Sequence, residues 1–230
     1  IHLVSIIITH FVVRDSDYKR ERVLRFSAIF PNCGYMALPL QLAILGKDGV
    51  FYGAAYIAIF NIFSWTYGIA LMGGKSQISA KKLIINPGII GVFLGLFLFF
   101  SQISLPSIPE NVLGHLAALN TPLPMIIIGF YLAGITSFSV LKDAKLLLVI
   151  ILKLLVFPLL AVGVLYFVGF RGTILVSLAI SASAPTAANT VMYATRFGTD
   201  TTLSSSLVSL TSLFSIVTMP LIISIAMFLA

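Results

Sequence analysis

Charged residues are scarce in this sequence. Only 9% of its 230 residues are charged, whereas 59% are hydrophobic. A soluble domain carries about 25% charged residues, so this composition indicates an integral membrane protein. The formal net charge of +7 comes from basic residues spread over the loops between apolar segments. That distribution is typical of membrane protein loops, so no nucleic acid partner is expected.

Cysteine and histidine are too few to build a metal or redox centre. The single Cys33 cannot form an intrachain disulfide, and in its apolar surroundings a thiol packs as a small apolar side chain. The three histidines His2, His10 and His115 are scattered, and no pair of carboxylates lies within an apolar segment. A membrane-embedded enzyme needs such groups together. We therefore predict no enzymatic activity, no metal site and no cofactor.

Long apolar segments dominate the chain, and most approach the roughly 20 residues needed to cross a bilayer. The first segment gives only about 20 Å of helix. We therefore expect this helix to begin before residue 1 and the chain to lack an amino-terminal part. The eight segments are residues 1–13, 26–44, 50–72, 87–104, 116–136, 144–168, 173–195 and 202–229.

Basic residues alternate between the two sides of these segments. The loops after the first, third, fifth and seventh segments carry eleven Lys and Arg residues, and the other loops carry only Lys47 and Arg171. This asymmetry predicts a multi-pass protein of the cell membrane with the odd-numbered loops in the cytoplasm. Lys153 lies inside the sixth segment. We expect its side chain to snorkel to the cytoplasmic surface; the alternative is a charge for a substrate anion or counter-ion.

Two apolar segments are broken by a proline among small polar residues, at residues 30–34 and 184–190. Proline removes a backbone donor and clashes with the preceding turn, so each helix is expected to open there. Inside a bilayer the freed backbone groups are tolerated only where they face protein or a watery cavity. A matched pair of interrupted segments is the best sequence pointer to the binding site of a transporter.

The two breaks belong to a predicted internal repeat. Pro31 and Pro185 are 154 positions apart, and each segment runs into a Gly-x-Asp turn, at residues 46–48 and 198–200. By the charge count, the two broken segments begin on opposite sides of the membrane. This pattern predicts an inverted-topology repeat of five helices. The second copy would run from about Pro87 to Ala230, and the first would lack two helices.

The chemistry at the breaks suits a carboxylate. Each half-helix that begins after a proline presents free amides and the positive end of its dipole. Gly34 lets a ligand approach the backbone. Asn and Thr side chains can add neutral donors, although a hydroxyl often bonds its own helix instead, as we expect for Ser212 and Thr218. The predicted substrate-binding residues are Pro31, Asn32, Cys33, Gly34, Asn61, Pro185, Thr186, Asn189, Thr190, Thr211 and Ser215.

Eight of these eleven residues lie in short motifs, at which the sequence resembles the auxin efflux carrier (AEC) family, bacterial relatives of the plant PIN-formed auxin exporters. The resemblance covers nearly the whole chain. The resemblance depends on the order and spacing of several weak motifs. They are Pro31–Pro39, Ile85–Gly88, Leu123–Gly129, Ala184–Thr186 and Ser209–Pro220.

The resemblance implies an all-α, ten-helix membrane fold of two inverted five-helix repeats with two crossed broken helices, shared with bile acid:sodium symporter-like proteins. It implies a transport (core) domain from residues 1–72 and 139–230, scaffold helices in 87–138 and a cytoplasmic loop at 73–86. Family members export or exchange organic anions. The implied function is therefore a secondary transporter (efflux carrier) of a small organic anion, such as a carboxylate, by alternating access.

Several alternatives stay open. The coupling ion is H⁺ or Na⁺: no acidic residue lies at mid-membrane, His10 is expected to be a packed histidine, and sodium could be held by carbonyls and hydroxyls at the breaks. The rival functions are a sodium-coupled symporter of a larger organic anion, a passive channel, and a non-transport membrane sensor or scaffold. Gly91 and Gly95 permit close helix packing within the scaffold or in a homodimer; a monomer is equally open.

Overall fold

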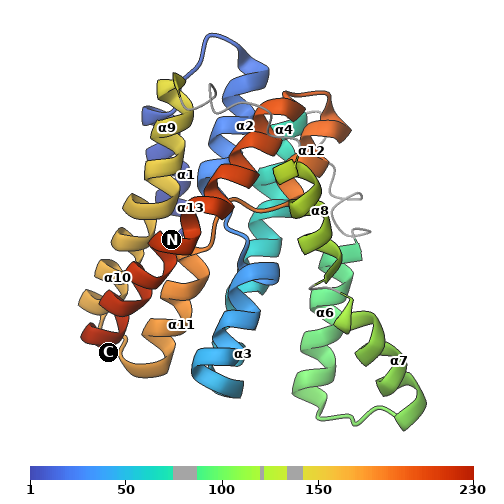
Figure 1. The fold of residues 1–230 in the computed structure, drawn as a ribbon. Coiled ribbons are helices and arrows are strands. Elements are labelled where there is room, and N and C mark those ends of the chain that lie inside the picture. Colours follow the sequence, from blue (N-terminus) through green and yellow to red (C-terminus); the bar gives the residue numbers. More distant parts are fainter. Residues whose placement is uncertain (75–86, 120–121, 134–141) are drawn as a thin grey trace.

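The computed structural model describes residues 1–74, 87–119, 122–133 and 142–230, and the elements named in these ranges are all helices (Figure 1). The predicted loop 73–86, with Asn86 of one family-like motif, falls largely outside them. Three helical runs in the described ranges are long and apolar enough to cross a membrane, which confirms an all-helical membrane protein. These runs are Cys33–Gly73, Ala144–Val168 and Thr201–Leu229.

The first two helices are α1 (His2–Val12) and α2 (Tyr18–Ile29). Helix α2 begins well before residue 26, where the apolar segment was predicted to start. The Asp17 side chain accepts a hydrogen bond from the Lys19 amide at 2.9 Å and caps the helix, so the charged stretch becomes its first turns. The end of α2 is buried around Phe26. Hydropathy alone missed the charged half of this helix.

An ion cluster ties the α1–α2 loop to the start of α9 (Ala144–Ile151). Asp15 pairs with Arg20 and with Lys145, each at 3.1 Å, and Arg20 also pairs with Asp143. Asp143 in turn caps α9 by accepting from the Lys145 amide at 3.0 Å. Two segments more than a hundred residues apart are thereby fixed at one end of the molecule.

The ion cluster is expected to make stability depend on acid pH. Burial raises the pKa of Asp15, but the Asp17 amide and the charges of Lys145 and Arg20 outweigh it and lower this pKa below its usual value. Asp15 therefore stabilises the fold above about pH 4, near the pKa of the unfolded chain, and the contribution is lost as pH falls through the lower folded pKa. Arg20 and Lys145 remain partly exposed to solvent, and ion pairs screened in this way contribute less than about 1 kcal/mol each, so the effect is modest.

The measurement is Tm against pH for the wild type and Asp15→Asn in the same detergent. The variant should melt lower at pH 7 and show a flatter profile below pH 4. Asp48→Asn is the matched control, because Asp48 is exposed and makes no ion pair among the described residues. Parallel profiles for wild type and Asp15→Asn would contradict the assignment.

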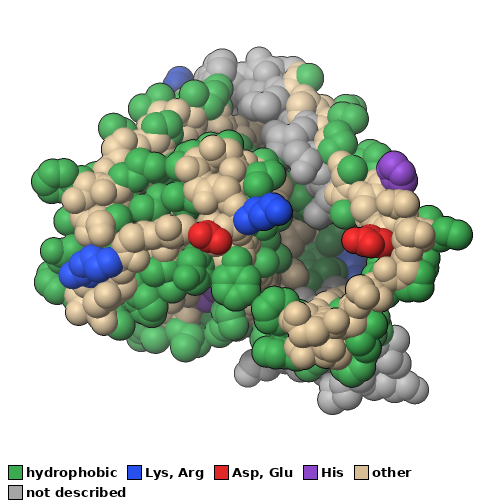
Figure 2. All heavy atoms as spheres, turned by 90° about the horizontal axis from the view of Figure 1, so that it is seen from below, with side chains coloured by type: hydrophobic (Ala, Val, Ile, Leu, Met, Phe, Trp, Pro, Cys, Tyr) green, Lys and Arg blue, Asp and Glu red, His purple; other side chains and the backbone are tan. Residues whose placement is uncertain are grey.

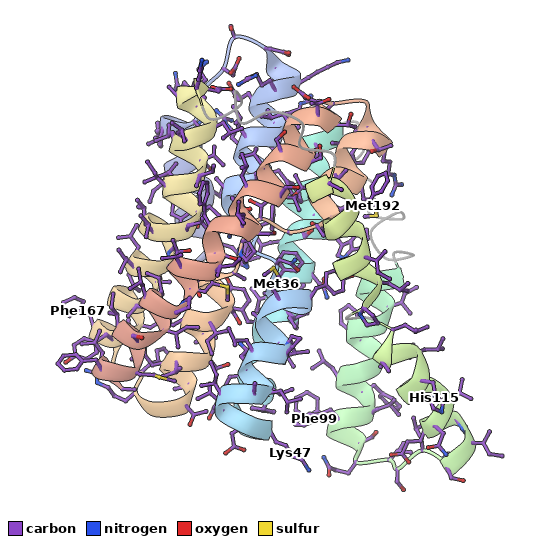
Figure 3. All side chains as sticks on the ribbon, viewed as in Figure 1. Met36, Lys47, Phe99, His115, Phe167 and Met192 are labelled. Carbon is purple, nitrogen blue, oxygen red and sulfur yellow. The ribbon has the colours of Figure 1, made fainter. Side chains whose placement is uncertain are left out.

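A helical hairpin follows the first break. It consists of η1 (Cys33–Ala37), α3 (Leu38–Phe63), η2 (Ser64–Gly68) and α4 (Ile69–Gly73). Helix α3 reverses at Gly46, whose φ of +66° favours glycine, and this confirms the predicted tight turn at Lys47 (Figure 3). The arms touch closely, since a Cβ on Gly53 would lie 2.0 Å from the Gln41 side chain. Gln41 also donates to the Ser177 carbonyl at 2.8 Å, which joins the hairpin to α11.

Helices α6 (Pro87–Ser101) and α7 (Ser107–Ala118) stand to one side of this body in Figure 1, whereas α8 (Pro122–Ala133) packs against α13 (Thr201–Leu229). Helix α7 was not predicted, because the sequence suggested a loop around Glu110. A proline in the first turn, Pro109, suits a helix start, so the segment is helical although none of its residues is buried. The end of the molecule seen in Figure 2 displays mainly apolar side chains and few charged ones.

The last part of the chain supplies the remaining walls of the core. Buried aromatic rings join it to α2: the ring of Phe26 lies 4.5 Å from that of Phe30 and 5.3 Å from that of Tyr193. Buried aromatic rings therefore lie beside both helix breaks. The elements after α9 are η5 (Leu152–Val156), α10 (Phe157–Val168), α11 (Gly172–Ser183), α12 (Asn189–Phe197) and α13 (Thr201–Leu229).

Candidate functional site

The two proline breaks lie directly against each other, and Met36 in Figure 3 marks their level in the middle of the molecule. The Asn32 amide donates to the Pro185 carbonyl at 2.7 Å, and the Ala187 amide donates to the Phe30 carbonyl at 3.0 Å. Together these bonds form an isolated antiparallel bridge between residues 31 and 186. Backbone groups that each break frees are thus paired with the other break. We call this junction the crossing.

Proline sets the local geometry at both breaks. The residue before a proline is driven out of the helical region. Phe30 accordingly has φ −98° and ψ 110°, and Ala184 has φ −58° and ψ 144°. The last helical residues are therefore Ile29 and Ser183, two residues before each proline, and the chain leaves the helical conformation at Phe30 and Ala184.

Two threonines connect the second break to neighbouring helices: Thr186 lies in the break itself, and Thr211 lies on α13. The Thr186 amide donates to the Thr211 hydroxyl oxygen at 3.1 Å, and the Thr186 hydroxyl donates to the Ser27 carbonyl at 3.0 Å. Both threonine side chains are fully buried. Thr186 and Thr211 therefore join α13 and α2 to the second break, in addition to any contact with a ligand.

The two asparagines each leave one polar group without a partner. Asn32 is 2% exposed; its Oδ1 accepts from the Tyr35 amide at 3.3 Å, while its Nδ2 has no acceptor among the described residues. Asn189 donates through Nδ2 to the Ser64 hydroxyl at 3.3 Å, and no described residue donates to its buried Oδ1. Buried polar groups normally have partners. The crossing thus offers one free donor and one free acceptor to a ligand or water.

Open space lies beside the first break. A Cβ placed on Gly34 would meet no atom within 4 Å, although the residue is half-buried and its neighbour Cys33 is 1% exposed. The backbone at the start of η1 is therefore accessible on the Gly34 side. This agrees with the role that the sequence suggests for this glycine.

Three predicted site residues make no side-chain hydrogen bond to the other break or to the helices that hold it, among the described residues. Thr190 and Ser215 donate to carbonyls three residues back in their own segments, at 2.6 and 2.7 Å. Asn61 is half-buried, and its side chain makes no hydrogen bond in the described part of the chain. Ser212 bonds its own helix as expected, at 2.7 Å, whereas the Thr218 hydroxyl is buried without a partner in the described ranges. The expectation for Thr218 is therefore wrong.

Ser64 joins the site although it was not among the predicted site residues. Its hydroxyl accepts from Asn189, and its side chain is fully buried. The sequence signal was that Ser64 is one of three polar residues, with Asn61 and Thr66, in an otherwise apolar part of its segment. What the sequence could not show is the π-helical segment η2 that begins at this serine.

The side chains of Lys153 and His10 lie in the opposite environments to those predicted. Lys153 does not snorkel: it is 2% exposed, because η5 packs against α2, α11 and α13. His10 is exposed instead of packed. The buried histidine is His2, which is 4% exposed and has rings such as Tyr56 at 5.3 Å.

Comparison with known proteins gives two matches. A family model described as "Membrane transport protein" matches residues 1–81 and 76–223. An "Uncharacterized transporter" of Methanothermobacter thermautotrophicus is 29% identical over 214 residues, which make up 90% of this chain and 69% of that protein. The family model extends across both breaks and most of the helices that brace them.

Proposed function

Because the chain belongs to the membrane transport protein family, that of the auxin efflux carriers, we propose that this transporter is a secondary carrier of a small organic anion such as a carboxylate. The observation that supports the proposal is the crossing, where two helix breaks from distant parts of the chain meet and present unpartnered amide groups. Interrupted helices that meet at mid-membrane are a recurrent way to build a transport site.

The polarity of the crossing favours an anion. The Asn32 Nδ2 and the open backbone beside Gly34 are donor groups, and a carboxylate supplies strong acceptors. All seven acidic residues of the sequence lie in described loops, helix ends or α7, so none adds a negative charge at the crossing. A bound carboxylate would therefore meet donors without a competing carboxylate.

Sodium-coupled symport of a larger anion is the second candidate. It is favoured by Asn189 Oδ1, a buried oxygen without a donor among the described residues, because hard cations are bound by such oxygens. Sodium dependence of transport separates this candidate from the first.

We further propose alternating access between a transport domain (residues 1–72 and 139–230) and scaffold helices (87–138), with two inverted repeats. The proposal is supported by the matched order of break and turn: the turn glycines Gly46 and Gly198, one after each break, have φ of +66° and +62°. The loops at the end of the molecule that carries the ion cluster are rich in Lys and Arg, and this asymmetry supports a cytoplasmic location for that end.

The test is uptake and counterflow by the full chain reconstituted in liposomes. Acetate, succinate and benzoate are compared with the uncharged acetamide, succinamide and benzamide, with and without sodium and at two pH values. We expect saturable uptake and counterflow for at least one acid and for no amide; liposomes without protein are the control. Equal uptake of an acid and its amide, or uptake of no acid, would reject an anion carrier. Uptake without counterflow would favour a passive channel.

A further inference from the structure

Three π-helical segments among the described residues converge on the crossing. Segment η1 begins directly after the first break, and η2 carries Ser64, the partner of Asn189. Segment η5 carries Lys153 and packs against α2 and α11, the two helices that end at the breaks. Short π-helical segments are rare and occur frequently at functional sites. Hydrogen bonds already connect η1 and η2 to the crossing. The function of η5 and its lysine is then the one to be explained.

Lys153 is enclosed by the elements that hold the crossing together. Segment η5 packs against α2, which ends at the first break, and α11, which ends at the second. It also packs against α13, the helix whose Thr211 braces the second break. The side chain is 2% exposed.

No acidic group of this chain neutralises Lys153. All seven acidic residues lie in the ranges that the structure describes. Three of them form the four ion pairs, and Lys153 takes part in none of these pairs. Nor does any described residue accept a hydrogen bond from it. The other acidic residues lie at helix caps, in turns or on exposed α7: Asp17, Asp48, Glu110 and Asp200. A buried, uncompensated ammonium is costly in protein and in lipid alike, so an intramembrane lysine is by default a functional group.

We propose that Lys153 supplies the positive charge of the substrate site, so that a substrate carboxylate binds against its ammonium group while the amides of the crossing hold the rest of the anion. The inference rests on the proposed function and names the residue that determines its charge specificity. Lys153 then distinguishes an acid from its amide, whereas Asn32 and Asn189 recognise the shape and hydrogen bonds of both. The anion, when bound, is the missing partner of the buried charge.

The experiment compares Lys153→Met with wild type in the full purified chain. Binding of acetate, succinate and benzoate, and of their three amides, is measured by calorimetry and thermal shift. We expect Lys153→Met to weaken binding of the acids at least tenfold and to leave binding of the amides unchanged. Lys47→Met is the matched control, because Lys47 is an exposed lysine in the α3 turn. It should bind like the wild type.

The empty protein gives a second readout. Replacing a buried uncompensated charge by an apolar side chain of similar size is often neutral or stabilising. The Tm of empty Lys153→Met should therefore equal or exceed that of the wild type, and Lys153→Arg should keep the preference for acid over amide. If Lys153→Met fails to fold, Lys153→Gln against Lys153→Arg makes the same comparison of neutral and charged side chains.

The outcomes separate the two proposals. If the wild type prefers acids and Lys153→Met prefers them equally, this inference is wrong and the anion carrier stands. A lower Tm in all neutral variants with unchanged acid preference would make Lys153 a structural residue, and would also overturn it. If the wild type shows no preference for any acid, both proposals fall.

Discussion

Replacing Asn32 or Asn189 by alanine is expected to lower kcat/KM for carboxylate transport by about 10- to 100-fold, since hydrogen bonds to charged groups contribute about 1.5–3 kcal/mol. Asn32 Nδ2 and Asn189 Oδ1 are the buried groups at the crossing without described partners. Uptake by reconstituted protein measures the effect. Asn111→Ala is the matched control, because Asn111 is exposed on α7. Unchanged kinetics in both site variants would refute the site.

Aspartate substitutions distinguish the two asparagines and the two candidate functions. Asn189→Asp keeps the shape of the side chain but adds a negative charge, so an anion carrier should lose more activity than with alanine. A sodium-coupled carrier should instead keep or strengthen its sodium dependence, because a carboxylate is a better ligand for the cation. Asn32→Asp keeps the oxygen that caps η1, whereas Asn32→Ala loses this cap at a cost of about 1 kcal/mol. Comparing Asn32→Asp with Asn32→Ala thus separates stability from recognition.

The positions of the two breaks could be predicted because their cause is local, whereas their crossing was implied only by the family resemblance. Proline acts on its own backbone and on the residue before it, so Pro31 and Pro185, each set among small polar residues, were expected to interrupt their helices. The matching turns at Gly46 and Gly198 then indicated that the breaks correspond. The structure places the two breaks in hydrogen-bond contact. The sequence therefore predicted a local backbone constraint at two positions, Pro31 and Pro185.

The environment of single polar side chains could not be predicted in the same way. Whether Lys153 reaches the surface depends on the helices that surround η5, which hydropathy does not report. His2 and His10 are eight residues apart on α1, yet only His2 faces the core. The partner of a hydroxyl is equally a tertiary property: Thr190 bonds its own segment, and Thr211 also bonds the second break.

Thr211→Val is expected to destabilise the protein by about 1–3 kcal/mol, the cost of leaving a buried donor unsatisfied. Valine has nearly the shape of threonine, so no cavity forms, but the buried Thr186 amide loses its acceptor at 3.1 Å. Neither lipid nor the packed interior offers a replacement. Thr190→Val is the matched control: the Ala187 carbonyl that accepts from its hydroxyl also accepts from its amide at 3.0 Å, so no group is left unpaired. Unfolding in denaturant or by heat measures both.

Thr211→Ser decides whether the hydroxyl or the packing of Thr211 matters. Serine keeps the acceptor for the Thr186 amide and removes one methyl group, which costs about 0.5–1.5 kcal/mol in a buried site. If the hydrogen bond holds the crossing, stability falls in the order wild type, Thr211→Ser, Thr211→Val, and counterflow falls in the same order. If Thr211 only fills space, Thr211→Val should match the wild type and Thr211→Ser should be the weakest. The reversed order would show that the Thr211 hydroxyl of α13 does not hold the second break, and that the backbone bridge alone holds the crossing.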